Sequence, residues 1–358
     1  MGSVIIGSGR ALPARIVTND ELSEIVDTTD EWIVPRTGIH TRHVAIEETC
    51  TDLGAQAALR ALGLEEGGWQ REAGAIDAAT LDMIICPTLT ADTHFPSEAA
   101  RIRERIGATN AVCYDMSCAC SGCVYGLSTA DLIMAGAAFA RQEAARTGTP
   151  MRCNDVRRVL VVAAERLSKL VDWEERATCI LFGDGAAAAV LTNGDAGTPK
   201  RCLPSAPRLR DVRCGADGRQ YPLLTVGGGT NRNYKPGDPV QDDFYLQMQG
   251  REVFKQAVRS LSAVCSELLE DNGLTLEDID LFIPHQANLR IIEAVGDRLK
   301  LGSEKIFVNL DEYGNTSAAS IPLGIGDACA QGRIRPGSRV LLSAFGGGFT
   351  WGAALLEF

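Results

Sequence analysis

The sequence has no long hydrophobic run. No stretch approaches the roughly 18 consecutive apolar residues that a membrane-spanning helix needs. The first residues, 1–6, also lack the basic region, apolar stretch and cleavage site of a secretory signal. We therefore expect a cytoplasmic protein that does not contact a membrane.

Positive charge is in short supply as well. The chain carries 35 Lys and Arg against 46 Asp and Glu, a formal net charge of −11. Because binding to a phosphate backbone needs a concentrated basic surface, this balance excludes general nucleic-acid binding.

Histidine is scarce, with four in 358 residues. A histidine at the end of a strand is therefore a candidate functional residue.

Cysteine is more frequent, but its density is far below that of a disulfide scaffold. The chain has 12 cysteines, and several, such as Cys86 and Cys265, lie in apolar runs where a reduced thiol behaves as a small hydrophobic side chain. Cys113, Cys118, Cys120 and Cys123 form a cluster, and the last three lack the paired Cys-x-x-Cys units and nearby histidines of common zinc sites. A metal site is the weaker interpretation of this cluster, and we expect none.

Short apolar runs typical of strands alternate with longer stretches typical of helices, which indicates an α/β fold. Three polar stretches rich in Gly, Pro and Arg are predicted as surface loops: residues 142–155, 195–221 and 231–242. The predicted strands are residues 4–8, 81–87, 111–116, 159–164, 186–192, 223–226, 279–284, 306–309, 340–344 and 353–358. The predicted helices are residues 51–62, 97–106, 122–141, 250–272, 288–299 and 317–331.

The second half of the chain repeats the first. The matching segments are residues 81–85 with 279–283, 158–162 with 339–343, and 185–187 with 352–354. Matches in the same order indicate a duplicated domain, so we place one half at residues 1–194 and the other at 195–358. In the register of this repeat, Cys120 and Asn315 occupy equivalent turns between a strand and a helix.

Cys120 is the candidate nucleophile. The small neighbours Ser117, Ala119, Ser121 and Gly122 leave its sulfur accessible at a tight turn before a helix. Unpaired N–H groups at a helix N-terminus favour the thiolate and predict a lowered thiol pKa. A thiolate exchanges thioesters readily. On position alone, a buried structural cysteine is an equally good interpretation.

His285 and Asn315 follow strands in the same way. His285 lies at the carboxyl end of an apolar segment, where open α/β sheets gather ligands. Asn315 precedes a helix, and an ordinary turn or helix cap explains an asparagine there equally well. Beside a thiolate that accepts an acyl group, an imidazole N–H and an amide N–H can jointly stabilise an enolate oxygen. The glycines at 346–348 add backbone N–H groups for an oxyanion.

Short motifs containing these residues follow one another at 30–34, 36–39, 115–122, 182–186, 284–288, 314–317 and 346–351. In this order they resemble the β-ketoacyl-acyl carrier protein synthase III family of the thiolase superfamily, over nearly the whole chain. The resemblance implies a thiolase-like, five-layered αβαβα fold in a homodimer. It also implies a decarboxylative Claisen condensation that initiates fatty-acid or polyketide-type synthesis, with acyl-CoA and malonyl-acyl carrier protein as substrates and no cofactor. Cys120 would carry the acyl group while His285 and Asn315 stabilise the enolate.

The resemblance implies further roles. The backbone N–H groups of Cys120 and Gly347 would form the oxyanion hole, and Trp32 and Arg176 would sandwich the CoA adenine by stacking. Phe95 would reach across the dimer to the partner's acyl pocket. The other matches line the path of the CoA arm: Arg36, Met248, Arg251, Phe254, Ala257, Ala287 and Asn288.

Some of these matches leave alternatives open. For Met248 and Phe254, packing in the core is an equally good interpretation. Arg251 stands where the family commonly has asparagine, and Cys118 and Cys123 stand where small or aromatic residues are usual. We therefore expect the contacts to the CoA arm and the shape of the acyl pocket to differ from the family pattern.

Basic residues recur on one predicted helix. Arg251, Lys255 and Arg259 are four residues apart, which places them on one face. Together with Arg290 they predict a docking site for an acidic carrier protein, and a merely solvated helix face is the alternative.

Two other functions compete with condensation: acyl transfer from Cys120 to another nucleophile, and a non-catalytic partner subunit. The complete Cys-His-Asn set argues against the second.

Overall fold

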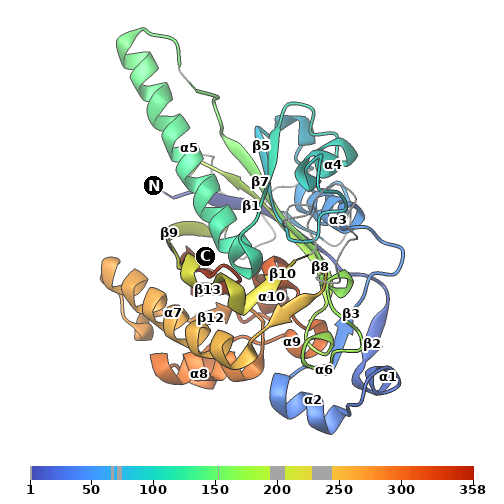
Figure 1. Cartoon of the computed structure of the whole chain (residues 1–358). Helices are drawn as coiled ribbons and strands as arrows, with labels where there is room; N and C mark the ends of the chain where they lie inside the picture. The colour runs from blue at the N-terminus through green and yellow to red at the C-terminus, as the bar shows by residue number, and fades with distance from the viewer. Residues whose placement is uncertain (1, 66–67, 71–74, 152, 194–205, 228–243) are drawn as a thin grey trace.

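In the part of the chain that the structure describes, a mixed ten-stranded sheet forms the centre (Figure 1). The computed structural model describes residues 2–65, 68–70, 75–151, 153–193, 206–227 and 244–358. Along the sheet the strands are, in order, β12 (Leu281–Pro284), β13 (Arg339–Gly346), β14 (Thr350–Glu357), β9 (Arg208–Ala216), β1 (Val4–Ala11), β8 (Asp184–Thr192), β7 (Arg158–Arg166), β5 (Met83–Pro87) and β6 (Val112–Met116). Off this path, β4 (Gly68–Gln70) pairs with β1.

The order of the strands shows the duplication directly. In one half, β5 and β7 run parallel and are followed by antiparallel β8 and β1. In the other half, β12 and β13 run parallel and are followed by antiparallel β14 and β9. Within the sheet, β1 and β9 join the two halves through one residue pair, Val4 with Arg208. All three segment matches read from the sequence fall on corresponding strands. The expected boundary between residues 194 and 195 lies outside the described residues.

The helices lie in three layers around the two halves of the sheet. One outer layer holds α3 (Cys50–Leu62) and α4 (Glu98–Arg105), and the other holds α7 (Gly250–Asp271) and α8 (Leu289–Leu299). Between the halves lie α5 (Gly122–Thr147) and α10 (Ser320–Ala330). The smaller elements are α1 (Asn19–Ser23), α2 (Asp30–Thr37), α6 (Arg176–Cys179), α9 (Leu310–Tyr313), the paired strands β2 (Ile16–Thr18) and β3 (Thr41–His43), and the paired strands β10 (Leu224–Val226) and β11 (Leu246–Met248).

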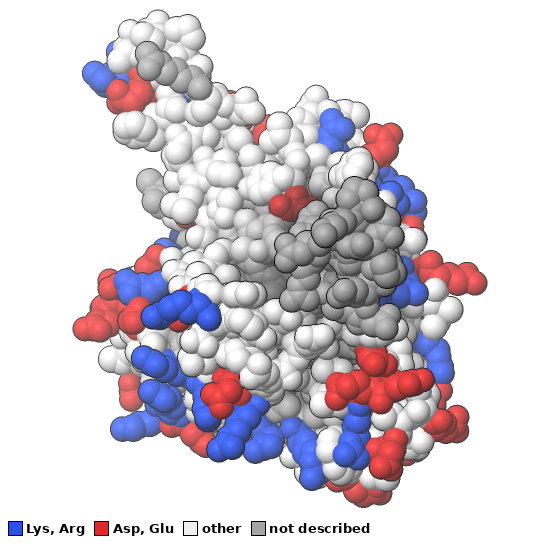
Figure 2. Space-filling view, viewed as in Figure 1, with Lys and Arg blue, Asp and Glu red and all other residues white. Residues whose placement is uncertain are grey.

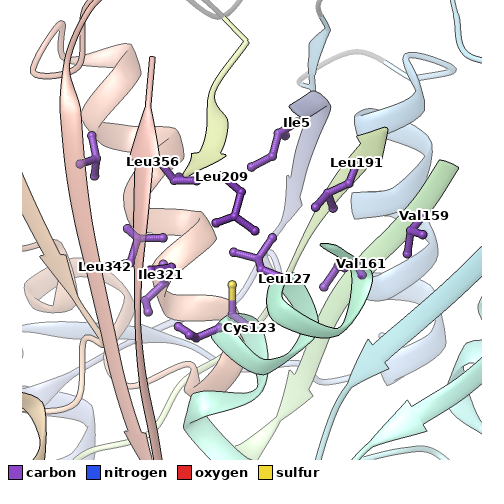
Figure 3. Close-up of a cluster of buried hydrophobic side chains, with 14 of the residues drawn as sticks. Ile5, Cys123, Leu127, Val159, Val161, Leu191, Leu209, Ile321, Leu342 and Leu356 are labelled. Atoms are coloured by element: carbon purple, nitrogen blue, oxygen red, sulfur yellow. The ribbon is translucent and has the colours of Figure 1, made fainter. Parts of the chain in front are cut away.

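The alternation of side chains along the strands explains how the layers of the fold form. Because successive side chains of a strand point to opposite faces, Ile84 packs in the outer core with α3 and α4 while Ile85 packs in the central core. Figure 3 shows the central core, where Leu127 of α5 and Ile321 of α10 lie between side chains of both halves. These alternating faces produce the five-layered αβαβα arrangement that the resemblance implies.

The apolar character of α5 follows from its place in this core. Within the described residues, the stretch Ala119–Thr147 is long and apolar enough, by length and composition, to cross a membrane. Its buried side chains, among them Leu127, Ala130 and Met134, pack in the central core. The last turns of α5 extend beyond the body of the molecule (Figure 1).

Two loop predictions are wrong. Residues 142–147 continue α5, and residues 208–216 form β9, which pairs with β14. The strand β9 was not predicted because its sequence is rich in charged residues. Three arginines and an aspartate accompany a single fully buried side chain, Leu209. The third predicted loop, 231–242, lies outside the described residues.

The predicted strand at 306–309 is also wrong. It is reduced to one parallel bridge between Ile306 and Phe282. The segment leaves the sheet because the backbone N–H of Asn309 donates to the side-chain Oε1 of Gln286, at 3.0 Å, instead of to a neighbouring strand.

Packing of α7 on the sheet supplies a stability test. Leu268→Ala removes a fully buried side chain from the outer core, so we expect the free energy of unfolding to fall by about 2–5 kcal/mol. Leu64→Ala, at an exposed position after α3, is expected to change it by less than about 0.5 kcal/mol. Urea denaturation of both variants measures the difference, and equal effects would contradict the packing described for α7.

Candidate active site

One cavity of about 1300 Å³ brings the three candidate residues together. Cys120 comes from the short turn before α5, His285 from the end of β12, and Asn315 from the segment after α9. His285 and Asn315 are buried, and Cys120 is partly buried. The lining also includes nearly all residues that the resemblance assigns to the CoA arm or the oxyanion hole: Trp32, Arg36, Met248, Arg251, Phe254, Ala257, Ala287, Asn288 and Gly347.

The nucleophile turn has a counterpart in the other half of the chain. The turn η2 (Ala119–Ser121) leads into α5, and η7 (Ser317–Ala319) leads into α10. Each begins with a non-glycine residue at positive φ, 46° for Ala119 and 51° for Ser317. The structural repeat therefore pairs Ala119 with Ser317, and Cys120 with Ala318. The expected equivalence of Cys120 and Asn315 is therefore wrong. Cys120 corresponds to Ala318, three residues after Asn315, because the two halves align by the starts of their central helices and not by the ends of their strands.

Burial dominates the chemistry of the thiol. It raises the pKa of Cys120 to about 12, a hydrogen bond with the Ser317 side chain lowers that pKa in part, and the nearby Glu165 carboxylate raises it further. The lowered pKa predicted from the helix N-terminus is therefore wrong for this site. A thiol with so high a pKa needs a base or a reaction partner before it acts as a nucleophile.

His285 is held at both its backbone and its ring. Its N–H donates to the Ser343 carbonyl at 2.7 Å, which continues the ladder between β12 and β13. Its Nδ1 lies 2.6 Å from Oγ of Ser320, at the start of α10. Burial lowers the pKa of His285 to about 3, so the imidazole is neutral at physiological pH. Because Nδ1 is engaged, Nε2 is the nitrogen that remains for a ligand.

Asn315 is fixed by a segment from the other half of the chain. Its N–H donates to the Leu181 carbonyl at 2.8 Å, and its carbonyl accepts the N–H of Gly183 at 3.0 Å. A side chain at Gly183 would lie 2.2 Å from the carbonyl oxygen of Tyr313, so only glycine fits there. The side-chain Oδ1 accepts the N–H of Ser317 at 2.9 Å, which leaves the amide NH₂ as the part that faces a ligand.

The glycine-rich end of β13 packs on the nucleophile turn. A Cβ at Gly346 would lie 2.7 Å from the backbone nitrogen of Cys120 and 3.0 Å from that of Ser121. Glycine at 346 therefore lets the two backbones approach each other. The neighbouring Gly347 lines the cavity near Cys120.

Two guanidinium groups lie over the indole ring of Trp32. The Cζ atoms of Arg36 and Arg176 lie 4.4 Å and 4.3 Å from the centroid of its indole ring. Arg176 also donates to the backbone carbonyl of Asp27 at 2.8 Å. The structure thus brings together the pair expected to sandwich adenine. Arg176 covers the ring directly, so a base can stack on that face only after Arg176 moves.

Three of the four predicted basic residues line the cavity: Arg251, Lys255 and Arg290. Arg251, Lys255 and Arg259 are exposed on α7, and Arg290 is exposed on α8. Figure 2 shows Lys and Arg side chains gathered on the side of the molecule that holds these helices. Lys255 also pairs with Glu252 at 2.7 Å, as expected for residues three apart on a helix.

Phe95 lies outside the cavity lining. It is 86% exposed on the segment between β5 and α4, whereas the adjacent His94 lines the cavity. Within the described residues, no group of three or more His, Cys, Asp or Glu side chains is placed to hold a metal ion.

The sequence analysis missed three side chains that support the site. Ser320 contacts the ring of His285, and the side chain of Ser317 lowers the pKa of the Cys120 thiol. Glu165 is fully buried at the end of β7 and accepts a hydrogen bond from Ser317 at 3.1 Å. One signal was available, because an acidic residue that directly continues an apolar strand is unusual unless it is partnered.

A thiolase-like αβαβα fold whose cavity joins a cysteine, a histidine and an asparagine defines the class of the acyl-transferring condensing enzymes. Comparison with known proteins agrees. The model of the 3-oxoacyl-[acyl-carrier-protein] synthase III C-terminal domain matches residues 269–358, and that of 3-oxoacyl-[acyl-carrier-protein] synthase III matches residues 147–206. A β-ketoacyl-[acyl-carrier-protein] synthase III of Nitratidesulfovibrio vulgaris is 48% identical over 357 residues, 99% of both chains.

Solved structures give the same result. The 3-oxoacyl-[acyl-carrier-protein] synthase III of Aquifex aeolicus matches with a TM-score of 0.82 and 40% identity over the full length of both chains. The priming β-ketosynthase of the R1128 polyketide pathway matches with a TM-score of 0.80 and 33% identity, covering 99% of this chain and 96% of the other. The chain belongs to the β-ketoacyl-acyl carrier protein synthase III family. The predicted family, fold class and enzyme class, an acyltransferase, are confirmed.

Close packing at Gly346 yields a test of the site. We expect Gly346→Ala to displace the backbone N–H of Cys120 and to slow acylation by about 100-fold or more, as loss of an oxyanion donor does. Gly218→Ala, where a Cβ meets nothing within 4 Å, is the matched control and should acylate normally. Acylation is followed with labelled acyl-CoA, and a normal rate for Gly346→Ala would contradict the contact.

Proposed function

We propose that this synthase condenses an acyl-CoA starter with malonyl-acyl carrier protein through an acyl-Cys120 intermediate, and so initiates fatty-acid or polyketide-type synthesis. The observation that carries the proposal is the single cavity that unites Cys120, His285 and Asn315 and opens among basic residues. The substrates supply the reacting groups, so the reaction needs no cofactor.

The first half-reaction is acyl transfer to sulfur. Cys120 attacks the thioester carbonyl, and the backbone N–H groups of Cys120 and Gly347 hold the oxygen that becomes negative. The approach of β13 at Gly346 supports this arrangement, because it sets the glycine-rich segment against the nucleophile turn. CoA then leaves and the acyl group stays on Sγ.

The second half-reaction is decarboxylation and carbon–carbon bond formation. Loss of CO₂ from the malonyl group leaves an enolate, whose oxygen accepts hydrogen bonds from Nε2–H of His285 and from the amide NH₂ of Asn315. A neutral imidazole suits this role, since burial lowers the pKa of His285 to about 3. The enolate carbon attacks the acyl-Cys120 carbonyl, and the cysteine sulfur leaves.

Both substrates enter by the same mouth. The adenine of CoA stacks on Trp32 once Arg176 has moved aside, and the arm runs past Arg36, Met248 and Phe254. The exposed arginines of α7 and α8 lie where an acidic carrier protein delivers its pantetheine, and long-range attraction speeds such an encounter. Arg251 and Arg290 line the mouth itself, whereas Arg259 lies farther along α7.

A homodimer in the cytoplasm completes the proposal. β6 lies at one end of the strand order, so in the described part of the chain one of its edges is left without a strand. Three large apolar side chains are also exposed: Phe95 on the segment before α4, and Leu132 and Phe139 on α5, are 86%, 69% and 66% exposed. Large exposed apolar side chains and an open sheet edge both favour burial against a second copy.

The division of labour in the triad is testable. We expect His285→Ala and Asn315→Ala to form acyl-enzyme from labelled acyl-CoA but to give no β-ketoacyl product with malonyl-acyl carrier protein, because they lack an enolate donor. Cys120→Ser, which has no thiolate, should retain no label. Mass spectrometry of enzyme and product separates the two steps.

The alternatives predict other results in the same assay. Acyl-enzyme without any β-ketoacyl product from the unmodified protein would replace condensation by simple acyl transfer. Normal condensation by both His285→Ala and Asn315→Ala would refute their assigned roles.

The role of Trp32 has its own test. Trp32→Ala removes the stacking surface, so we expect KM for acyl-CoA to rise by about 5- to 30-fold, in line with about 1–2 kcal/mol for a stacking contact. Acyl-pantetheine, which has no adenine, should show equal KM values for the variant and the parent. A similar rise with both substrates would indicate that Trp32 supports the fold instead of binding adenine.

A further inference from the structure

A buried serine contacts the imidazole of His285. Oγ of Ser320, the first residue of α10, lies 2.6 Å from Nδ1 of the ring. His285 lines the cavity, whereas Ser320 does not belong to the cavity lining. The two residues are only 5% and 2% exposed, so water competes little for this contact. By chemistry alone, either the hydroxyl or the ring nitrogen could be its donor.

A backbone N–H fixes the direction of the contact. The N–H of Gln286 donates to the same Oγ of Ser320 at 3.3 Å. Ser320 has one hydroxyl hydrogen, and among the described residues Nδ1 of His285 is the one group bonded to it that can accept this hydrogen. A bond in the opposite direction, from Nδ1–H to Oγ, would leave the buried hydroxyl hydrogen without an acceptor, which is costly. Ser320 therefore donates to Nδ1.

Further hydrogen bonds hold α10 against the end of β12. Nε2 of Gln286 donates to the carbonyls of Pro284 at 2.8 Å and of Phe307 at 3.2 Å. Its Oε1 accepts the N–H of Asn309 at 3.0 Å. Nδ2 of Asn309 donates to Oδ2 of Asp327 at 2.9 Å, and Asp327 belongs to α10. These bonds fix the backbone of Gln286 relative to the helix that carries the serine hydroxyl.

The direction of the bond from Ser320 determines where the proton of His285 lies. Burial lowers the pKa of His285 to about 3, so the ring is neutral and carries a single N–H. Because Nδ1 accepts a hydrogen bond, that N–H is on Nε2. The other tautomer would turn the lone pair of Nε2 toward an enolate oxygen and repel it.

We infer that Ser320 is a positioning residue that keeps the proton of His285 on Nε2, where the enolate oxygen needs a donor. The inference rests on the proposed function and specifies what fixes its enolate donor. Ser320 acts through the imidazole and does not reach the reacting atoms, because it lies outside the cavity lining. The same hydrogen bond restrains rotation of the ring, so the direction of Nε2–H is fixed together with the tautomer.

The two half-reactions depend on this tautomer to different extents. Acyl transfer to Cys120 uses the backbone N–H groups of the oxyanion hole, whereas the enolate uses Nε2–H of His285. Loss of the Ser320 hydroxyl should therefore impair condensation and leave acylation unchanged.

The tautomer can be measured without any substrate. In ¹⁵N NMR of histidine-labelled protein, a ring nitrogen that carries a proton has a chemical shift well separated from that of one that does not. The chain has four histidines, and the signals missing from His285→Ala are those of His285. We expect protonated Nε2 and unprotonated Nδ1 in the unmodified protein. In Ser320→Ala we expect a mixture of tautomers or the Nδ1–H form.

Kinetics of the same variant separate the half-reactions. Alanine is a good helix former, and the Ser320 hydroxyl bonds to residues 285 and 286 and not to its own helix, so α10 tolerates Ser320→Ala. We expect β-ketoacyl formation to slow by about 100-fold or more, as loss of an oxyanion donor does, with an unchanged rate of single-turnover acylation.

Ser262→Ala is the matched control. Ser262 is a buried serine of α7 whose hydroxyl donates to the Val258 carbonyl at 2.7 Å, within its own helix. This variant should match the unmodified protein in the NMR spectrum of His285 and in both rates.

The outcomes are distinct. An Nδ1–H tautomer in the unmodified protein, or an unchanged Nε2–H tautomer in Ser320→Ala, would overturn the inference. An equal fall of acylation and condensation in Ser320→Ala would also overturn it, since Ser320 would then support the cavity as a whole. If the unmodified protein forms no β-ketoacyl product, the proposed function fails, and the NMR spectra still decide what Ser320 does to His285.

Discussion

The active site depends on the contact between two strained turns. Ala119 and Ser317 adopt positive φ values, which cost roughly 1–3 kcal/mol each for a residue with a side chain and persist only where the surroundings enforce them. Here the two turns contact each other, the end of β13 presses on one, and β7 lies against the other. Because each turn starts a central helix of one half, the duplication itself places nucleophile and asparagine side by side.

The same burial that holds the turns governs the charges in the site. It raises the pKa of Cys120 and of Glu165 and lowers that of His285, so each group is shifted toward its neutral form. A neutral imidazole is a good hydrogen-bond donor to an enolate, whereas a neutral thiol is a poor nucleophile. One environment therefore favours the condensation step and opposes the acylation step.

Much of this architecture could be predicted from the sequence. Apolar runs located most of the strands, the ordered matches revealed the duplication, and the short motifs identified the family and its three central residues. Prediction failed for segments whose local sequence pattern does not match their place in the tertiary structure. β9 carries charged residues, and its place in the sheet comes from pairing with β14. Ile306 retains a single β-bridge because the backbone N–H of Asn309 donates to the side chain of Gln286.

The sequence by itself determined that Cys120, His285 and Asn315 stand at the starts of turns after apolar segments, because residue type and periodicity are local properties. Only the tertiary structure decided which groups act on them. Ser317 and Glu165 lie far from Cys120 along the chain and meet it where the two halves touch, and Ser320 reaches His285 from another helix. The pKa values likewise depend on burial among all these neighbours, since the cost of charge is set by what surrounds a group and not by its position in the sequence.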